Sequence, residues 1–212
     1  MKKTTLLALL FITTLLFSTS FSMKQAKAGI LLEPYIGQVI QGSGSSGYAS
    51  TSNWEHEYTG LIYGGRAGVV FSGLMLGGEY SMQSFEMSSK SGSTTYKDDI
   101  AKKQSGLFVG YHFPMHLRLW GTYFLQGEIK GESSPGTHLI DNKSKYNQMS
   151  GYGAGISYVI ANIVGLNLEY RTMKYKQYIY DGYSYASVYS KKLTVNEILL
   201  SASLPLVLFG GK

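Results

Sequence analysis

Apolar and polar residues alternate with a period of two along much of this chain. From residue 164 to 171 every second residue is apolar, and the residues between them are polar or charged apart from one glycine. Successive residues of a β-strand point to opposite faces, so this pattern predicts strands with one apolar and one polar face. Beyond residue 29 no stretch keeps a 3.6-residue apolar period or an 18-residue apolar run. The sequence therefore predicts an all-β fold.

The first residues have the pattern of a secretory signal peptide. Lys2 and Lys3 form a basic start, residues 4–17 are apolar and rich in leucine, and Ala26-Lys27-Ala28 supplies a small-x-small site. Cleavage is expected after Ala28, which leaves residues 29–212 as one domain. The alternative is a transmembrane anchor, for which the apolar run is short.

Removal of residues 1–28 also changes the charge of the chain. The segment contains four lysines and no acid, so the formal net charge falls from +6 to +2. The basic balance is therefore largely a property of the targeting segment, and nucleic acid is not an expected partner. Charged residues make up 15% of the chain, which is low for a soluble domain. Cysteine is absent, which excludes a disulfide framework and a thiolate metal site.

Tight turns and long polar stretches alternate between the expected strands. The turns fall at 71–74, 113–117 and 160–164, and the long stretches are 42–57, 87–102, 131–147 and 179–191. This order is typical of outer-membrane barrels, which have short periplasmic turns and long external loops. The expected strands are 30–41, 58–71, 74–86, 103–114, 117–130, 148–160, 164–178 and 192–206.

The apolar faces of these strands carry no charge until their upper ends, as a lipid-facing surface requires. Aromatic residues also gather near strand ends, at Tyr35, Phe71, Phe113 and Tyr158 on one side and at Tyr63, Tyr123 and Tyr170 on the other. An open sheet edge in lipid would leave backbone groups unpaired, so the last strand should pair with the first. We therefore expect a closed eight-stranded antiparallel up-and-down transmembrane β-barrel. The alternative is a soluble barrel whose apolar face is its core.

The charged residues of the strands predict a polar lumen. The only three arginines have inward parity, whereas most lysines of the mature chain fall in loops or near the upper rim. Guanidinium groups suit buried bidentate pairing with carboxylates. The expected lumen network comprises Glu33, Arg66, Glu79, Arg118, Glu128, Glu169, Arg171 and Glu197. Within it, Arg66, Glu79, Glu169 and Arg171 should lie near mid-height and pair with Glu197. The network is interpreted as a plug, with a gated ion path as the alternative.

Several segments resemble the small eight-stranded outer-membrane barrels, namely the OmpA transmembrane domain and the OmpX/Ail group. They are Leu32-Glu33-Pro34-Tyr35-Ile36-Gly37, the Gly-Gly-Glu-Tyr of 77–80, Val109-Gly110-Tyr111-His112-Phe113-Pro114 and the glycine-rich stretch 148–160. Such barrels usually end on an aromatic residue that the assembly machinery recognises, whereas this chain ends Phe209-Gly210-Gly211-Lys212. Pro205 cannot donate a ladder hydrogen bond, so regular pairing should stop near it.

Some small outer-membrane barrels modify lipid A or cleave proteins, and such chemistry needs a histidine beside a serine or carboxylate. The four histidines are His56, His112, His116 and His138, and none stands in a His-x-Ser pair or an acidic cluster of those enzymes. No metal-ligand spacing, phosphate loop or dinucleotide motif is present. We expect no enzymatic activity, no cofactor and no metal.

The last long loop is the candidate contact surface. Tyrosine is a rigid amphipathic contact residue, and flanking lysines favour anionic groups. The residues are Tyr178, Tyr180, Tyr183, Tyr185, Tyr189, Lys191 and Lys192. They suit lipopolysaccharide, a host protein or a surface glycan, or simply neutralise the cell's own lipopolysaccharide.

The sequence thus predicts a monomeric bacterial outer-membrane barrel of the porin class, with a structural or surface-interaction role. Its expected partners are outer-membrane lipid, lipopolysaccharide and the barrel assembly machinery, with an extracellular ligand at the loops as a further option. Adhesion, ion conduction and lipid A modification are the alternatives.

Overall fold

The computed structural model describes residues 28–47, 53–91, 94–132, 142–161, 163–185 and 192–208. Ten strands account for nearly all of them. They are β1 (Ala28–Gly47), β2 (Asn53–Phe71), β3 (Leu74–Ser91), β4 (Thr94–His112), β5 (Leu117–Gly131), β6 (Ser144–Ile160), β7 (Val164–Tyr180), β8 (Tyr183–Tyr185), β9 (Lys192–Ser203) and β10 (Leu206–Leu208). The leader predicted at 1–28 lies outside the described residues, except Ala28.

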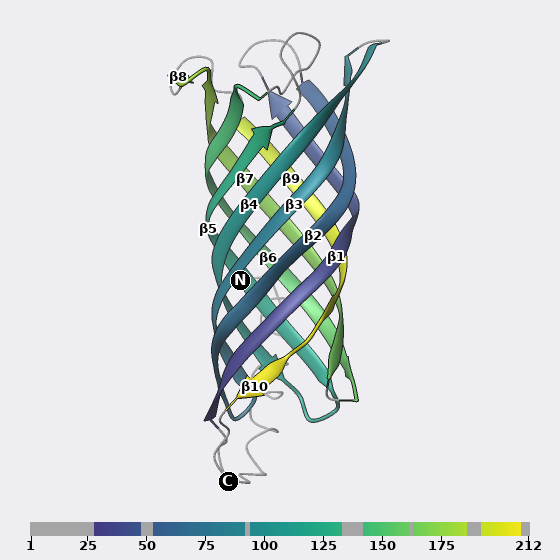
Figure 1. Ribbon diagram of the computed structural model, residues 1–212, viewed down its shortest axis with the longest axis vertical. Coiled ribbons are helices and arrows are strands. Elements are labelled where there is room, and N and C mark those ends of the chain that lie inside the picture. Colours follow the sequence, from purple (N-terminus) through teal and green to yellow (C-terminus); the bar gives the residue numbers. More distant parts are fainter. Residues whose placement is uncertain are drawn as a thin grey trace, which may run out of the picture.

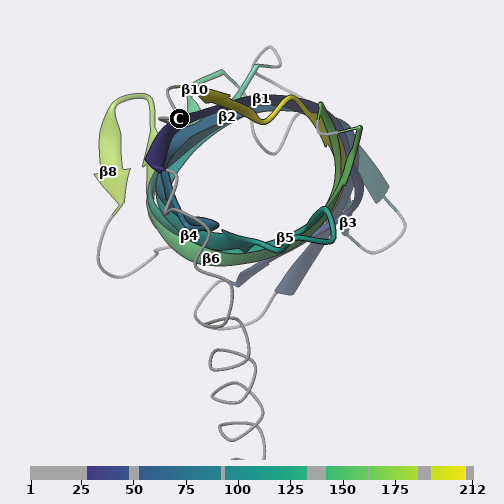
Figure 2. The same cartoon turned by 90° about the horizontal axis from the view of Figure 1, so that it is seen from below.

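The strands form one closed antiparallel ring, as Figures 1 and 2 show from the side and from below. Each strand from β1 to β7 pairs with the next along the chain, and β9 pairs with both β7 and β1. The short strand β10 continues the line of β9 along β1, while β8 pairs antiparallel with the last residues of β7 alone. The barrel thus has eight staves and no open edge along its main wall. This confirms the predicted fold class and the pairing of the last stave with the first.

The tight turns lie together at one end of the barrel. Ser72 and Gly73 join β2 to β3 with φ values of 49° and 86°. Positive φ at both central residues is the requirement of a type I′ hairpin turn, whose twist matches that of the strands. This end is called the lower end below, following its place in Figure 1.

The strands reach well beyond the predicted boundaries at the other, upper end. Strands β3 and β4 stay paired up to Ser91 and Thr94, although 87–102 was predicted to be a loop. The prediction was wrong because most outward residues of this segment are polar or charged, so its composition is similar to that of a loop. Its inward residues still alternate as a strand requires, with Phe85, Met87 and Ile100 buried.

The final stave is interrupted where proline was predicted to stop it. Strand β9 ends at Ser203 and β10 begins at Leu206, so the ladder breaks at Leu204 and Pro205. The amide of Leu204 still donates to the carbonyl oxygen of Pro34 at 3.0 Å, which holds the break against β1. The prediction for Pro205 is confirmed.

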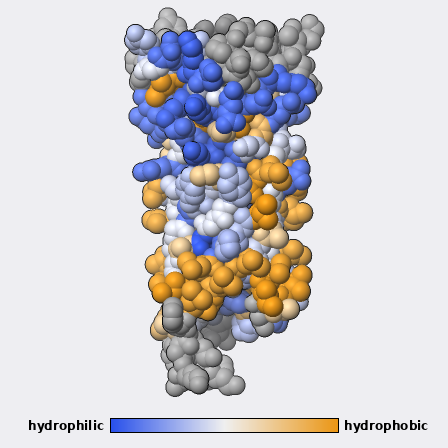
Figure 3. All heavy atoms as spheres, viewed as in Figure 1, coloured by the Kyte–Doolittle hydropathy of each residue, from blue (hydrophilic) through white to orange (hydrophobic). Residues whose placement is uncertain are grey.

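The polarity of the two faces inverts along the barrel. In the lower half the exposed outward residues are apolar, for example Leu76, Leu107 and Leu168, while the inward residues include every arginine. In the upper half the outward residues include Glu86, Lys103 and Lys174, and the inward residues are largely apolar. Figure 3 shows this change on one face, with apolar atoms below and hydrophilic atoms above.

A row of outward tyrosines marks the boundary between the two halves. Its members are about half exposed and lie on five strands: Tyr63, Tyr80, Tyr123, Tyr152 and Tyr170. Tyr123 and Tyr152 are direct cross-strand partners, and Tyr170 donates from its hydroxyl to Oδ1 of Asn196 at 3.2 Å. Among the residues that the structure describes, no helix is long and apolar enough to cross a bilayer.

Candidate functional site

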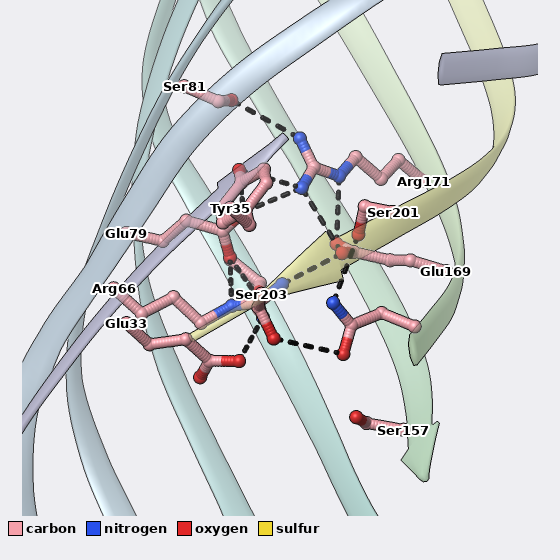
Figure 4. Close-up of polar contacts among 12 residues, drawn as sticks. Glu33, Tyr35, Arg66, Glu79, Ser81, Ser157, Glu169, Arg171, Ser201 and Ser203 are labelled. Atoms are coloured by element: carbon pink, nitrogen blue, oxygen red, sulfur yellow. Dashed lines mark hydrogen bonds and ion pairs between the residues drawn. The ribbon is translucent and has the colours of Figure 1, made fainter. Parts of the chain in front are cut away.

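The lower lumen holds a compact network of ion pairs, drawn in part in Figure 4. Its charged members are three arginines and three glutamates, all at most 4% exposed, so the set is formally neutral. We call them the lumen network: Glu33, Arg66, Glu79, Arg118, Glu169 and Arg171. The network joins opposite walls of the barrel, because its members come from β1, β2, β3, β5 and β7.

Glu79 is the most heavily contacted carboxylate of the network. Arg171 Nη2 lies 2.6 Å from its Oε1, and Arg66 Nε lies 3.3 Å from its Oε2. The hydroxyls of Tyr35 and Thr122 donate to the same carboxylate at 2.8 and 2.9 Å. Buried charges are tolerated only when they are paired and hydrogen-bonded, and Glu79 meets both conditions.

Arg171 and Arg66 share Glu169 as a second partner. Arg171 Nε lies 2.8 Å from Oε1 of Glu169, and Arg66 Nη2 lies 2.9 Å from Oε2. Arg171 also donates to Ser81 Oγ at 3.2 Å (Figure 4). The planar guanidinium fork can satisfy several acceptors at once, which explains why arginine and not lysine occupies these positions.

Aromatic rings pack against the guanidinium groups. Cζ of Arg66 lies 4.2 Å from the ring centre of Trp120 and 5.0 Å from that of Tyr35. Cζ of Arg171 lies 5.2 Å from the ring of Phe124. A cation over an aromatic face is attracted by the ring quadrupole, so these rings stabilise the charges while excluding water.

Arg118 anchors the lower edge of the network. It donates to Oε1 of Glu33 at 2.8 Å and to Ser157 Oγ at 3.1 Å. A small apolar cluster of Leu31, Met75 and Phe108 also lies in the lower half of the lumen, on β1, β3 and β4. The lower lumen thus contains packed hydrophobic side chains beside the ion pairs.

Glu197 faces the lumen as predicted, but its ion pair is formed with Lys102 and not with the central arginines. Lys102 Nζ contacts its Oε1 at 2.5 Å, and Tyr58 donates to the same oxygen at 2.7 Å. Lys102 was missed because the predicted fourth strand began one residue later, at 103, which left this lysine in a loop. Gln104 points inward, and a strand extended by one residue toward the N-terminus would have placed Lys102 on the same inner face.

Glu128 was also predicted to face the lumen, but it lies on the outer wall. Its carboxylate pairs with Lys145 at 2.5 Å, and both side chains are 37% exposed. The reason is a bulge in β5: Ser105 pairs with Gln126 and Gly106 with Phe124, so Leu125 is an extra residue. A one-residue bulge reverses the parity above it. Glu128 therefore turns outward, and the next residue, Ile129, is fully buried inside.

Tyr35 provides a third correction. It was assigned to an outer aromatic rim, but it is 6% exposed and its hydroxyl reaches the lumen network. Tyr35 has the same parity as Glu33, so alternation along β1 requires both side chains to point inward.

Above the lumen network the interior is filled by an upper apolar cluster. Its buried members share the inner face of the strand extensions: Tyr35, Val39, Tyr58, Ile62, Phe85, Met87, Ile100, Phe124, Ile129, Tyr146, Met149, Met173, Tyr175, Leu193, Val195 and Leu199. The sequence predicted a polar plug and not this second, apolar one. Above the lumen network the interior is thus filled mainly by hydrophobic side chains.

The candidate contact residues of the last loop are divided by the structure. Tyr178 packs partly buried against the upper apolar cluster, while Tyr180 and Tyr183 are 37% and 72% exposed. For Tyr185 and Lys192 the structure describes the backbone alone, in β8 and β9, and Tyr189 and Lys191 lie outside the described residues. Tyr178 therefore belongs to the barrel interior and not to a loop surface.

The exposed strand extensions carry surface ion pairs. Lys97 Nζ donates to Glu86 at 2.8 Å with both side chains more than half exposed, and this hydrogen bond raises the pKa of Lys97. No cluster of three or more metal-ligating side chains occurs among the described residues.

Comparison with known proteins adds two distant structural similarities. The crystal structure of Neisserial surface protein A (NspA) aligns with a TM-score of 0.48 at 16% identity, over 84% of this chain and 99% of that one. The outer membrane protein OprG from Pseudomonas aeruginosa aligns with a TM-score of 0.44 at 12% identity, over 87% and 99%. No protein-family model matches the chain, and no curated protein matches it.

Both TM-scores are below 0.5, so the assignment of the fold rests on this chain's own strand pairing. That pairing gives a closed, antiparallel, eight-stave up-and-down barrel, the architecture of the small outer-membrane barrels that the sequence resembles.

Proposed function

We propose that this chain is an integral outer-membrane protein that spans the bilayer with its lower half and presents its upper half outside the cell. The observation that carries the proposal is the inversion of side-chain polarity along the strands. A soluble barrel would keep its apolar residues inside along its whole length. Here the outward residues are mainly apolar up to about the tyrosine row and mainly polar or charged beyond it, where the buried residues are largely apolar.

The lower half has the properties that lipid requires. Its outward residues are apolar, and ring closure pairs the backbone groups along the wall. Tyrosines at the upper border of this surface suit the membrane interface. Strands of 9–11 residues are long enough to cross a bilayer, and β1–β7 have 15–20. The excess supports a barrel that continues beyond the membrane.

The orientation follows from the connections. Outer-membrane barrels have short turns on the periplasmic side and long loops outside. The tight turns here join β2 to β3, β4 to β5 and β6 to β7 at the lower end. In this orientation the extension is a rigid platform on the cell surface, and the predicted leader would direct export.

A closed lumen supports a structural or surface-interaction role over conduction. An ion would have to cross the lumen network and the upper apolar cluster. Eight-stranded barrels have interiors just wide enough for side chains to fill. We propose that the barrel does not conduct, and that its external function lies on the extension.

Adhesion through the upper surface is the second candidate. It is favoured by Tyr183, which is 72% exposed in a hairpin that stands out from the ring in Figure 2. Deleting residues 181–191 and measuring attachment of bacteria to host matrix proteins tests this candidate. Reduced attachment supports it, and unchanged attachment with normal surface expression rejects it.

We also propose that the chain is not an enzyme. His112 and His116 adjoin the connection from β4 to β5, at the end that we place in the periplasm, away from the outer leaflet. Lipid A extracted from cells that overexpress the protein should have an unchanged mass. Loss or gain of an acyl chain would refute this part of the proposal.

Fractionation and electrophoresis test the main proposal. The protein should be in the outer-membrane fraction, and an unboiled sample should migrate faster than a boiled one. Amine-reactive labelling of intact cells should modify Lys97 and Lys174 on the extension. Recovery from the soluble periplasm without a mobility shift would refute membrane insertion, and ohmic conductance steps in planar bilayers would refute the closed lumen.

A further inference from the structure

An open hollow of about 280 Å³ lies in the outer wall, where β3, β4, β5 and β6 meet. The side chains around it that face outward are polar except for one aromatic ring: Tyr80, Lys103, Ser105, Gln126, Glu128, Lys145 and Asn147. Gly127 and Gln104 complete its lining, and the Gln104 side chain turns inward at 3% exposed. We call this the wall pocket.

Two irregularities of the sheet create the wall pocket. The bulge at Leu125 shifts the β4–β5 register, and the β5–β6 ladder is interrupted between the pairs Phe124–Gly151 and Ile129–Tyr146. Gln148 on β6 has a φ of 51°, which a non-glycine residue rarely adopts. Such features often re-aim side chains near functional sites, so a hollow at two coinciding defects is a candidate binding site.

The charge of the wall pocket favours an anion. Lys103 and Glu128 are cross-strand partners, and Lys145 pairs with Glu128 at 2.5 Å. Lys130, the cross-strand partner of Lys145, also points outward and is exposed. The charged lining residues Lys103, Lys145 and Glu128 sum to +1, and the adjacent Lys130 raises the local charge to +2. Lys103 has no ion pair among the described residues.

The amide side chains of the wall pocket add a second kind of recognition. Asn147 Oδ1 is buried yet has no hydrogen-bond partner within the described part of the chain, and Gln126 is exposed beside it. A buried acceptor that the protein leaves without a partner can accept a hydrogen bond from a bound molecule. Sugar hydroxyls and acylated amino groups are donors that suit an amide oxygen.

The position of the wall pocket at the upper border of the apolar surface indicates which kind of ligand would fit. Tyr80 belongs to the tyrosine row, so the pocket begins where the apolar surface ends. Below it, Leu107 and Val109 on the outer face of β4 are 57% and 52% exposed. A molecule seated here would place an anionic, hydroxyl-bearing head in the pocket and apolar chains along β4.

From these observations we infer that the wall pocket binds the head group of a phosphorylated glycolipid of the outer leaflet. A phosphate is placed at Lys103, the sugar hydroxyls at Gln126 and Asn147, and the acyl chains along Leu107 and Val109. This inference rests on the proposed function, because the ligand is a lipid of the membrane that the lower half would span.

Lipid retention in nanodiscs tests the inference. The folded full mature barrel is placed in phosphatidylcholine nanodiscs, and bound lipid is counted by native mass spectrometry. The probes are bisphosphorylated lipid A, dephosphorylated lipid A, phosphatidylglycerol and inorganic phosphate. We expect lipid A to be retained at least tenfold better than each of the other three. Equal retention of phosphatidylglycerol, or better binding of inorganic phosphate, would overturn the assignment of a glycolipid.

Variants of opposite charge make the test specific. Lys103→Gln should weaken lipid A retention about tenfold, whereas Glu128→Gln should strengthen it, because the latter removes the only carboxylate of the pocket. Lys97→Gln is the matched control, since Lys97 lies six positions away on the same outward face of β4 and should leave retention within twofold. Asn147→Leu should reduce the preference for lipid A over phosphatidylglycerol.

Failure of the wall pocket as a lipid site can be distinguished from failure of the proposed membrane insertion. If Lys103→Gln retains lipid A like the wild type while the heat-modifiable band shows a folded barrel, the wall pocket is not the site and membrane insertion stands. If the wild-type protein is soluble and does not enter nanodiscs, the proposed function itself is wrong.

Discussion

Arg171 on β7 and Glu79 on β3 meet in the lumen, with Nη2 of the arginine 2.6 Å from Oε1 of the glutamate. Three strands of the wall lie between β3 and β7 in either direction around the ring, so the pair joins opposite sides of the barrel. Both side chains are fully shielded from solvent. The pair therefore links the barrel walls through a buried interaction and not through the sheet.

Arg171→Leu should lower the free energy of unfolding by about 3–5 kcal/mol, because Glu79 and Glu169 would lose a buried partner. Urea unfolding in detergent micelles measures the change. The double variant Arg171→Leu/Glu79→Gln keeps the network neutral, so it should lose less than the sum of the two single changes. Strict additivity would show that the two side chains do not interact.

Glu197 and Glu128 should respond very differently to the same change. Glu197→Gln leaves Lys102 buried without its carboxylate, which should cost about 3–5 kcal/mol. Glu128→Gln breaks a partly exposed pair with Lys145 and should cost about 1 kcal/mol or less. Thermal unfolding of the two variants side by side measures the difference. Equal losses would place Glu128 back in the lumen.

The bulge in β5 is tested with two aliphatic residues. Ile129→Ala should lower the free energy of unfolding by about 2–5 kcal/mol, since it opens a cavity in the upper apolar cluster. Leu125→Ala removes a residue that is 51% exposed on the outer wall, so its loss in detergent should be clearly smaller. Urea unfolding measures both, and the reverse order would contradict the bulge.

Gly155 leaves room for the ring of Trp120. A methyl group at this glycine would overlap Cζ2 of Trp120, whereas at Gly121 it would lie 3.7 Å from the carbonyl oxygen of Gly153. Gly155→Ala should therefore displace the indole and cost about 1–3 kcal/mol, while Gly121→Ala should not. Tryptophan fluorescence in a Trp54→Phe background reports on Trp120 alone. An unchanged spectrum for Gly155→Ala would refute this packing.

Much of the lower barrel could be predicted because each local signal there is complete. The alternation of Leu166, Leu168 and Tyr170 with Asn167, Glu169 and Arg171 identifies both faces of β7 without any neighbour. Ser72 and Gly73 likewise favour a tight turn by their own backbone preferences. Parity alone therefore assigned the six charged residues that the structure brings together.

The upper barrel could not be predicted in the same way, because parity is a local rule and bulges interrupt it. Leu125 reverses the faces above it only because β4 and β5 shift their register there. The sequence gives no marker for that shift. Lys102 was missed for a related reason, since its outward neighbours Ala101 and Lys103 look like loop residues until cross-strand pairing is known.

The sequence alone determined that the chain is built of two-faced strands, that the ring must close and that its arginines point inward, since these follow from alternation and from the cost of unpaired groups. Only the tertiary structure decided which carboxylate each cation pairs with, how far the strands extend and where the wall pocket forms. Those features depend on register between strands, and register is set by packing across the whole ring.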